Sequence, residues 1–432
     1  MGIGGSERKD RLPGGRLAAC AGIDFLVERE FLIDVSRLIW RVWTGRLPTG
    51  IDRVCLAYLD RYGSRAQAVV QRNGVFRILS PRESDRLFAL IRSGAPGFRR
   101  GLATLLPAML ATSAARADGR GAIYLNIGHT GLEEPGLPEW VERCGLRAVF
   151  LVHDLIPITH PEFCRAGEDE RHVQRMRNVL ACAAGIVGNS QATLTDLEAF
   201  AGREQVAVPP YLPAWISGND VPRAAPAAAL DRPHFIVVGT IEGRKNHVLL
   251  LQLWRSLVER MGPSTPRLLI VGQRGWEAEH AHAMLDRNPV IRGHVRELGN
   301  CDDAELARLI AGARALLMPS FAEGFGLPII EALQLGTPVI CSDLPAFREI
   351  AGDIPLFLDP LDGKGWERAV LAFLEDCPER SRQQRMMRDY RGPDWESHFA
   401  LVDPWLTGLP HRAAEQTANL AVQPYARTAR RG

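Results

Sequence analysis

Two carboxylates flank a glycine-rich turn in the segment EGFGLPIIEAL. Glu323 comes directly before Gly324 and Gly326, and Glu331 lies about one turn into the helix that Pro328 is expected to begin. Glycine lets a backbone approach a ligand closely, and the N–H groups at a helix start bind anions. A carboxylate beside an anion site is costly unless it accepts hydrogen bonds, and sugar and ribose hydroxyls are suitable donors.

This pattern predicts a binding site for a diphosphate or for sugar hydroxyls at the turn. The backbone amides of Phe325, Gly326 and Leu327 are expected to face the ligand. The alternative is that Glu323 only caps the helix and that Glu331 is a solvated surface residue.

Two cations lie in a second informative segment. Arg244 and Lys245 belong to the turn GTIEGRKN, which follows the buried strand predicted from HFIVVG. In doubly wound sheets, ligands bind at the C-terminal ends of the strands, where these cations would neutralise a diphosphate leaving group. A lone Arg-Lys pair is also common in a solvated turn, but its placement opposite the glutamate segment favours binding.

Short aliphatic or β-branched runs alternate with helical segments, which is typical of parallel sheets covered by helices on both faces. The strands predicted in the first half are Glu30 to Val35, Ala66 to Gln71, Ala122 to Ile127, Leu146 to His153 and Gly185 to Asn189. Those in the second half are His234 to Gly239, Arg267 to Gly272, Val295 to Leu298, Ala313 to Met318, Pro338 to Ser342 and Pro355 to Leu358. Residues 209–233 are rich in Pro and Ala without a helical stripe and are predicted to connect the two series.

Length and composition indicate a folded protein of two domains. The chain has 432 residues, 46% of them hydrophobic and 24% charged, which is too apolar for a disordered chain. A formal net charge of +2 does not favour nucleic acid binding. Eight scattered cysteines without paired spacing favour a reduced cytoplasmic setting and no zinc site. No apolar run is long enough for a signal peptide or a membrane span.

Together, these segments resemble the retaining glycosyltransferases of family 4, which have the GT-B fold of two Rossmann-like domains facing a donor-binding cleft. Glu323 and Glu331 match the family's E-x7-E motif, and GTIEGRKN matches its phosphate-binding turn with Arg244 and Lys245 at the cationic positions. The resemblance extends from about Glu30 to Leu406.

Two segments of the first half carry a weaker resemblance. FLVHDLIPITHPEFC places His153 where the family has a histidine near the donor sugar. GRLPTGIDRV resembles the glycine-containing first loop of related polysaccharide enzymes and places Gly50 at the donor. Asp52 replaces a glycine of that loop, which puts close phosphate approach there in doubt. GIVGNSQATLTDL resembles a strand and helix cap of the family, with Asn189 or Ser190 as the cap.

The resemblance also implies that the C-terminal helix crosses back onto the first domain. The predicted organisation is a tail at 1–27, an acceptor domain at 28–213 completed by a helix at about 394–408, a linker at 214–232, a donor domain at 233–393 and a tail at 409–432.

As an activity, the resemblance implies transfer of a hexose from a nucleoside-diphosphate sugar to a glycan or lipid-linked acceptor, with retention of configuration, no metal and no other cofactor. Lys245 and Arg244 would stabilise the departing diphosphate, Glu323 would orient the sugar, Glu331 would hold the ribose, and His153 would approach the sugar. We favour mannose, in bacterial surface polysaccharide synthesis. A nucleotide-sugar epimerase and a catalytically silent glycan-binding scaffold are the alternatives.

Two further expectations concern the surroundings of the enzyme. SRLIWRVWTGRL, with Trp40 and Trp43, and FRRGLATLLPAML are predicted either to lie on the inner face of the cytoplasmic membrane or to pack inside the first domain. The acidic pair Asp302 and Asp303 is predicted to cap a helix and not to bind a metal ion.

Overall fold

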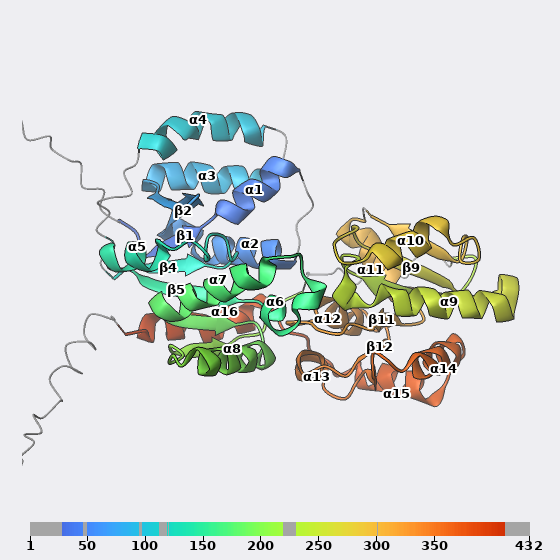
Figure 1. Cartoon of the computed structure of the whole chain (residues 1–432). Helices are drawn as coiled ribbons and strands as arrows, with labels where there is room; N and C mark the ends of the chain where they lie inside the picture. Colours follow the sequence, from blue (N-terminus) through green and yellow to red (C-terminus); the bar gives the residue numbers. More distant parts are fainter. Residues whose placement is uncertain are drawn as a thin grey trace, which may run out of the picture.

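The chain folds around two β-sheets, each flanked by helices (Figure 1). The computed structural model describes residues 28–45, 50–94, 97–111, 119, 121–218, 230–299 and 301–410. The predicted tail 1–27, residues 411–432 of the second predicted tail and residues 219–229 of the predicted linker lie outside the described residues.

The first sheet has seven strands in the order β3-β2-β1-β4-β5-β6-β7. These strands are β1 (Phe31–Asp34), β2 (Ala66–Arg72), β3 (Val75–Ile78), β4 (Ile123–Asn126), β5 (Arg147–Val152), β6 (Ala183–Gly188) and β7 (Tyr211–Pro213). The helices of this half are α1 (Ser36–Thr44), α2 (Gly50–Tyr62), α3 (Pro81–Ser93), α4 (Phe98–Ala111), α5 (Leu137–Arg143), α6 (Ile156–Thr159), α7 (Glu168–Cys182) and α8 (Gln191–Glu204).

The second sheet has six strands in the order β10-β9-β8-β11-β12-β13. These strands are β8 (His234–Val238), β9 (Arg267–Val271), β10 (Val295–Leu298), β11 (Leu316–Met318), β12 (Val339–Ser342) and β13 (Leu356–Leu358). The helices that follow them are α9 (His247–Met261), α10 (Glu279–Arg287), α11 (Asp303–Ala311), α12 (Leu327–Gln334), α13 (Pro345–Ala351), α14 (Gly363–Leu374), α15 (Pro378–Met386) and α16 (Trp395–Gly408).

The strand order creates a switch point in each sheet. Strand β1 lies between β2 and β4, and β8 lies between β9 and β11, in each case with parallel pairing on both sides. Chain connections leave such a strand and its neighbour in opposite directions, so a crevice opens at their C-terminal ends, where ligands bind in sheets of this kind. Both groups of residues singled out from the sequence follow such strand ends.

Every segment predicted as a strand overlaps a strand of the structure. Two strands were not predicted. Strand β3 pairs antiparallel with β2 through a turn at Asn73 and Gly74, both of which have positive φ as an Asn-Gly hairpin turn requires. Strand β7 lies inside the stretch 209–233, so the interpretation of all of that stretch as a connection was wrong. Proline is tolerated there because β7 is an edge strand.

Helix α16, the last helix described, lies on the first sheet's half (Figure 1, red). The Tyr58 hydroxyl of α2 is 2.9 Å from Nε2 of His398, and the Tyr62 hydroxyl donates to Asp403 at 2.6 Å. Phe399 packs edge-on against both tyrosine rings. The chain therefore returns to α2 after completing the second sheet.

A carboxylate of the second half binds the start of a helix of the first. Glu349 of α13 accepts hydrogen bonds from the N–H of Gln191 at 2.8 Å and of Ala192 at 3.1 Å. It also accepts one from Nε1 of Trp215 at 2.6 Å. The first N–H groups of α8 have no partner within their helix, and a negative charge is favourable at that end. Glu349 thereby ties the two halves together.

Candidate functional site

A cleft of about 690 Å³ lies where the two halves meet. Its walls come from the C-terminal ends of β5 and β8, from the starts of α2 and α12, and from the loop that follows β11. The residues predicted to act lie here: Gly50, His153, Arg244, Lys245, Glu323, Gly324, Phe325, Gly326, Leu327 and Glu331 all line it. The structure therefore brings all the predicted site residues into one cavity.

The glycine-rich turn is packed so tightly that larger residues do not fit. A Cβ at Gly324 would lie 2.2 Å from the His153 carbonyl oxygen, and Gly326 has a φ of 118°, which favours glycine. The Gly324 carbonyl accepts hydrogen bonds from Oγ of Ser190 at 2.9 Å and Oγ1 of Thr193 at 3.2 Å. The turn is thus held by the first half while it presents the start of α12 to the cleft.

The two glutamates do not behave as a cap and a surface residue. Gly326 is the N-cap of α12 and there is no side-chain cap there, while Glu323 bonds elsewhere. Glu331 is only 6% exposed and lies against Gly218, whose added Cβ would be 3.4 Å from Cγ of Glu331. The alternative interpretation of this pair as capping and solvated residues is therefore wrong.

Glu323 forms the centre of a buried ion-pair network. Its Oε1 is 2.6 Å from Nζ of Lys245 and its Oε2 is 2.5 Å from Nη1 of Arg244. Ser320 donates its hydroxyl to the same carboxylate at 3.0 Å, and Arg244 also pairs with Glu242 at 2.7 Å. Burial alone would raise the pKa of Glu323, but the charges of Arg244 and Lys245 outweigh it and lower that pKa to about 2.

The ion-pair network determines how Lys245 and Arg244 can bind an anion. Lys245 has three N–H donors, and Arg244 is held in place by its bond to the Ala322 carbonyl at 2.9 Å as well as by carboxylates. An arriving diphosphate would compete with Glu323 for their charge. The arrangement suits an anion that binds and leaves, because the cations are paired both before binding and after release.

His153 is neutral and of one defined tautomer. Burial lowers its pKa to about 4, so the ring is uncharged at pH 7. Its Nε2 lies 2.8 Å from the Ile127 carbonyl oxygen, which can only accept, so Nε2 carries the hydrogen. The other nitrogen, Nδ1, is then an acceptor. A neutral acceptor at the cleft wall suits a sugar hydroxyl better than a phosphate.

Asp52, whose presence put phosphate approach in doubt, does not line the cleft but is buried behind it, with its side chain 1% exposed. It pairs with Nε of Arg37 at 2.7 Å and with Nε of Arg41 at 2.9 Å. Arg37 lines the cleft and was missed from the sequence, as were Glu242 and Asp154. The one available signal was that Arg37 and Arg41 stand four residues apart in the sequence, shortly before the glycine-containing loop.

The remaining capping predictions are settled by hydrogen bonds. Ser190, and not Asn189, caps α8 by accepting from the Thr193 N–H at 3.0 Å. Asp302 caps α11 by accepting from the Glu305 N–H at 2.7 Å. Asp303 instead pairs with Arg53 of the first half at 2.7 Å.

The tryptophans of α1 face outward. Trp40 is 66% exposed and Trp43 is 41% exposed, whereas Leu38 on the same helix is buried. The guanidinium of Arg99 lies over the Trp43 ring at 5.1 Å. The alternative that this segment packs inside the domain is thus wrong for Trp40, although it holds for Leu38. Among the residues described, no helix is both long and apolar enough to cross a membrane.

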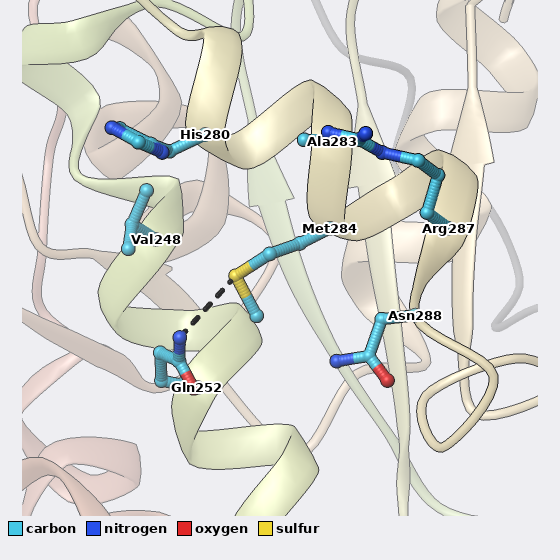
Figure 2. A pocket seen from close by; sticks show the side chains of 7 residues that line it. All are labelled: Val248, Gln252, His280, Ala283, Met284, Arg287 and Asn288. Carbon is cyan, nitrogen blue, oxygen red and sulfur yellow. Dashed lines mark hydrogen bonds between the residues drawn. The ribbon is translucent and has the colours of Figure 1, made fainter.

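A second hollow, of about 450 Å³, lies between α9 and α10. Its side chains belong to those two helices and to the residue after α10, and Nε2 of Gln252 lies 3.6 Å from the Met284 sulfur (Figure 2). None of its residues lines the cleft, and it contains no carboxylate. It lacks the paired charges that the cleft contains.

Known proteins resemble this chain in sequence and in fold. The family model "Glycosyl transferases group 1" matches residues 220–389. The serotype-specific mannosyltransferase WbdA of Escherichia coli is 34% identical over 236 residues, which cover 49% of this chain and 28% of WbdA. O-antigen chain mannosyltransferase B of Escherichia coli is 39% identical over 141 residues, covering 33% of this chain and 36% of that protein. The chain thus spans about a third of the length of these relatives.

Among solved structures, Anabaena HepE in complex with UDP and glucose superposes with a TM-score of 0.62 at 16% identity, covering 88% of this chain and all of HepE. This likeness concerns the fold. It agrees with two sheets, parallel except for β3, each with a switch point and facing one cleft. The chain therefore has the GT-B fold and carries, over residues 220–389 and so around Glu323, Glu331 and Lys245, a glycosyl transferases group 1 domain.

Proposed function

We propose that the chain is a retaining glycosyltransferase that moves a hexose from a nucleoside-diphosphate sugar to a glycan or lipid-linked acceptor in surface polysaccharide synthesis. The observation that carries this proposal is the network of Glu323 with Arg244 and Lys245, placed beside the start of α12 in an interdomain cleft. A nucleoside diphosphate needs positive charge and helix-terminal N–H groups when it departs, and both are present here.

Each residue has a role in this proposal. Lys245 and Arg244 take the charge of the departing diphosphate, so that no divalent cation is required. Buried Glu331 accepts hydrogen bonds from the ribose. Glu323 keeps the two cations in place and orients the sugar, and Nδ1 of neutral His153 accepts from a sugar hydroxyl.

We favour mannose as the sugar and GDP-mannose as the donor. The support is that the relatives named above are mannosyltransferases of Escherichia coli, one of them acting on O-antigen chains. The base and sugar are read by backbone groups and cavity shape. A donor screen therefore comes before any assay of transfer.

The test of the proposal begins with thermal unfolding in the presence of GDP-mannose, UDP-glucose, UDP-galactose or dTDP-rhamnose. A donor that binds the native state raises the melting temperature. Transfer is then measured with that donor and a lipid-linked glycan acceptor, with Lys245→Gln as the variant expected to lose turnover. Turnover that does not depend on acceptor would favour the epimerase, and binding without turnover or hydrolysis would favour the scaffold.

Location is part of the proposal. We infer that the first half docks on the inner face of the cytoplasmic membrane through the exposed Trp40 and Trp43 of α1, with the guanidinium of Arg99 over the Trp43 ring. Exposed indoles and arginines suit an anionic lipid surface. Flotation with anionic vesicles at low salt should be lost in a double variant with Trp40→Ser and Trp43→Ser.

The matched control for flotation is Leu361→Ser, which removes a 78% exposed apolar side chain in the second half. It should float like the parent. Flotation of the double tryptophan variant at the parent level, or failure of the parent to float, would remove the membrane proposal and leave the proposed reaction untouched.

A further inference from the structure

Asp52 belongs to the first turn of α2 and is buried. Its carboxylate is 1% exposed and joins two guanidinium groups, with Arg37 on one oxygen and Arg41 on the other. A carboxylate as deeply buried as that of Asp52 is stable only when it is paired, and the two guanidinium groups provide that pairing.

Arg37 is the member of this cluster that reaches the cleft. Its side chain is 31% exposed, compared with 18% for Arg41, and it lines the cleft while Arg41 does not. The stem of Arg37 is held against Gly128, where an added Cβ would lie 2.9 Å from Cδ of Arg37. Nη1 of Arg37 lies 3.5 Å from the Gly128 carbonyl oxygen, and the carbonyl of the preceding residue, Ile127, binds Nε2 of His153, so the guanidinium lies near that ring.

Two helix starts meet beside this arginine. Gly50 begins α2, and an added Cβ there would lie 3.1 Å from Cδ1 of Leu327, the first residue of α12. A side chain at position 50 would therefore press the halves apart. Both helices direct the positive ends of their dipoles toward this junction, and the ion-pair network of Lys245 lines the same cleft.

We propose that Arg37 binds the β-phosphate of the donor from the first half, and that Asp52 is the residue that positions it. This inference rests on the proposed function, because it assumes a diphosphate in the cleft. In a loop of glycines, a phosphate can approach the backbone N–H groups directly. In this chain Asp52 replaces one of those glycines and holds Arg37, whose guanidinium can donate two parallel hydrogen bonds to phosphate oxygens.

We assign Arg37 to the β-phosphate and not to the α-phosphate because of its position along the cleft wall. Arg37 neighbours His153, which the proposed function places at the sugar, and the β-phosphate is the one that carries the sugar. Glu331 marks the ribose end of the cleft. Arg37, close to the sugar end of the cleft, should therefore bind the β-phosphate, which is the terminal phosphate of a free nucleoside diphosphate.

The experiment compares binding of GDP with GMP, and of UDP with UMP, by calorimetry on the full chain. Arg37→Gln should weaken binding of the diphosphate about 10- to 100-fold and leave binding of the monophosphate unchanged. Asp52→Asn should act in the same direction, because the guanidinium loses its anchor. Arg37→Lys should restore part of the affinity, and Arg41→Gln, which keeps Asp52 and Arg37, should retain most of it.

If Arg37 and Asp52 had only a structural role, their variants would have a lower melting temperature but an unchanged ratio of diphosphate to monophosphate affinity. An unchanged ratio in folded Arg37→Gln overturns the inference, whether or not Asp52→Asn folds. Lys245→Gln tests the proposed function separately from the inference on Arg37. It should also lower the ratio of diphosphate to monophosphate affinity, whatever Arg37→Gln does. If the parent binds neither GDP nor UDP, the proposed function fails and the inference fails with it.

Discussion

Replacing Glu323 by Gln removes one charge from the centre of the ion-pair network and almost nothing else. The side chain keeps its size, but Arg244 and Lys245 lose the carboxylate that they share. We expect three results: a less stable protein, a lower turnover rate, and binding of free nucleoside diphosphate that is at least as tight as in the parent. The third result follows because the two cations no longer have to leave a carboxylate in order to bind phosphate.

The loss of stability can be worked out from the pKa of Glu323. Its value falls from 4.5, the ordinary value, to about 2 in the folded protein. At roughly 1.4 kcal/mol per unit this difference is about 3 kcal/mol of unfolding free energy at pH 7. Because the folded pKa is lowered, this contribution is complete above pH 4.5 and is lost as the pH falls toward 2.

Urea unfolding at pH 7 measures the difference between Glu323→Gln and the parent. The difference should narrow by about 2 kcal/mol between pH 7 and pH 3, because the Glu323 carboxylate becomes protonated in the unfolded parent chain while it stays ionised in the folded one. The matched control is Asp343→Asn, which breaks the ion pair of Asp343 with Arg348 on the surface, where both side chains are about half exposed. It should cost less than about 1 kcal/mol.

Equal stability of Glu323→Gln and the parent at pH 7 would refute the view that this carboxylate anchors the cations. Nucleotide binding gives a second, independent criterion. If calorimetry shows that the variant binds GDP and UDP much more weakly than the parent, Glu323 contacts the nucleotide part of the donor and its assigned role at the sugar is wrong.

Three further results are expected. Glu331→Ala should weaken binding of free nucleoside diphosphate by about 1 to 3 kcal/mol in calorimetry, because a buried partner of the ribose is lost; parent-like affinity would exclude that role. Turnover should survive EDTA, and a complete loss that added metal restores would mean that the leaving group is stabilised differently. Burial lowers the pKa of His398 to about 4, so this group should destabilise the fold by about 2 kcal/mol when the pH falls from 7 to 5. His398→Gln should remove that part of the pH dependence of urea unfolding. An unchanged pH profile would show that the ring takes up a proton as readily in the folded protein as in the unfolded chain.

The sequence predicted best those features that a short stretch of chain determines. Aliphatic runs predicted the strands at their correct places because such runs must be buried on both faces of a parallel sheet. Glycine spacing and the position of Pro328 predicted the start of α12, whose first residue is Leu327. The two strands that were not predicted, β3 and β7, lie at the edges of the first sheet, where burial is partial and the apolar pattern is weak.

The parts of the site that could not be predicted depend on residues far apart in the sequence. Glu349 reaches the start of α8 across 158 positions, and no local pattern indicates that its partner is a helix of the other half. From the sequence, Asp52 only put close phosphate approach at a glycine position in doubt, because its pairing with Arg37 and Arg41 is made by the fold. The roles of individual cleft residues remain predictions until the variants above are measured.

Helix α16 has a consequence for how the protein is made. Its residues Val402 and Leu406 are buried in the hydrophobic core, and His398 bridges Tyr58 to the Trp215 carbonyl. A ribosome delivers the chain from its N-terminus, so the half that emerges first is the last to obtain its final helix. Until then the surface of α2 that α16 covers stays open. We expect the second half to reach its native state earlier on the ribosome, and chaperones to be needed mainly by the first.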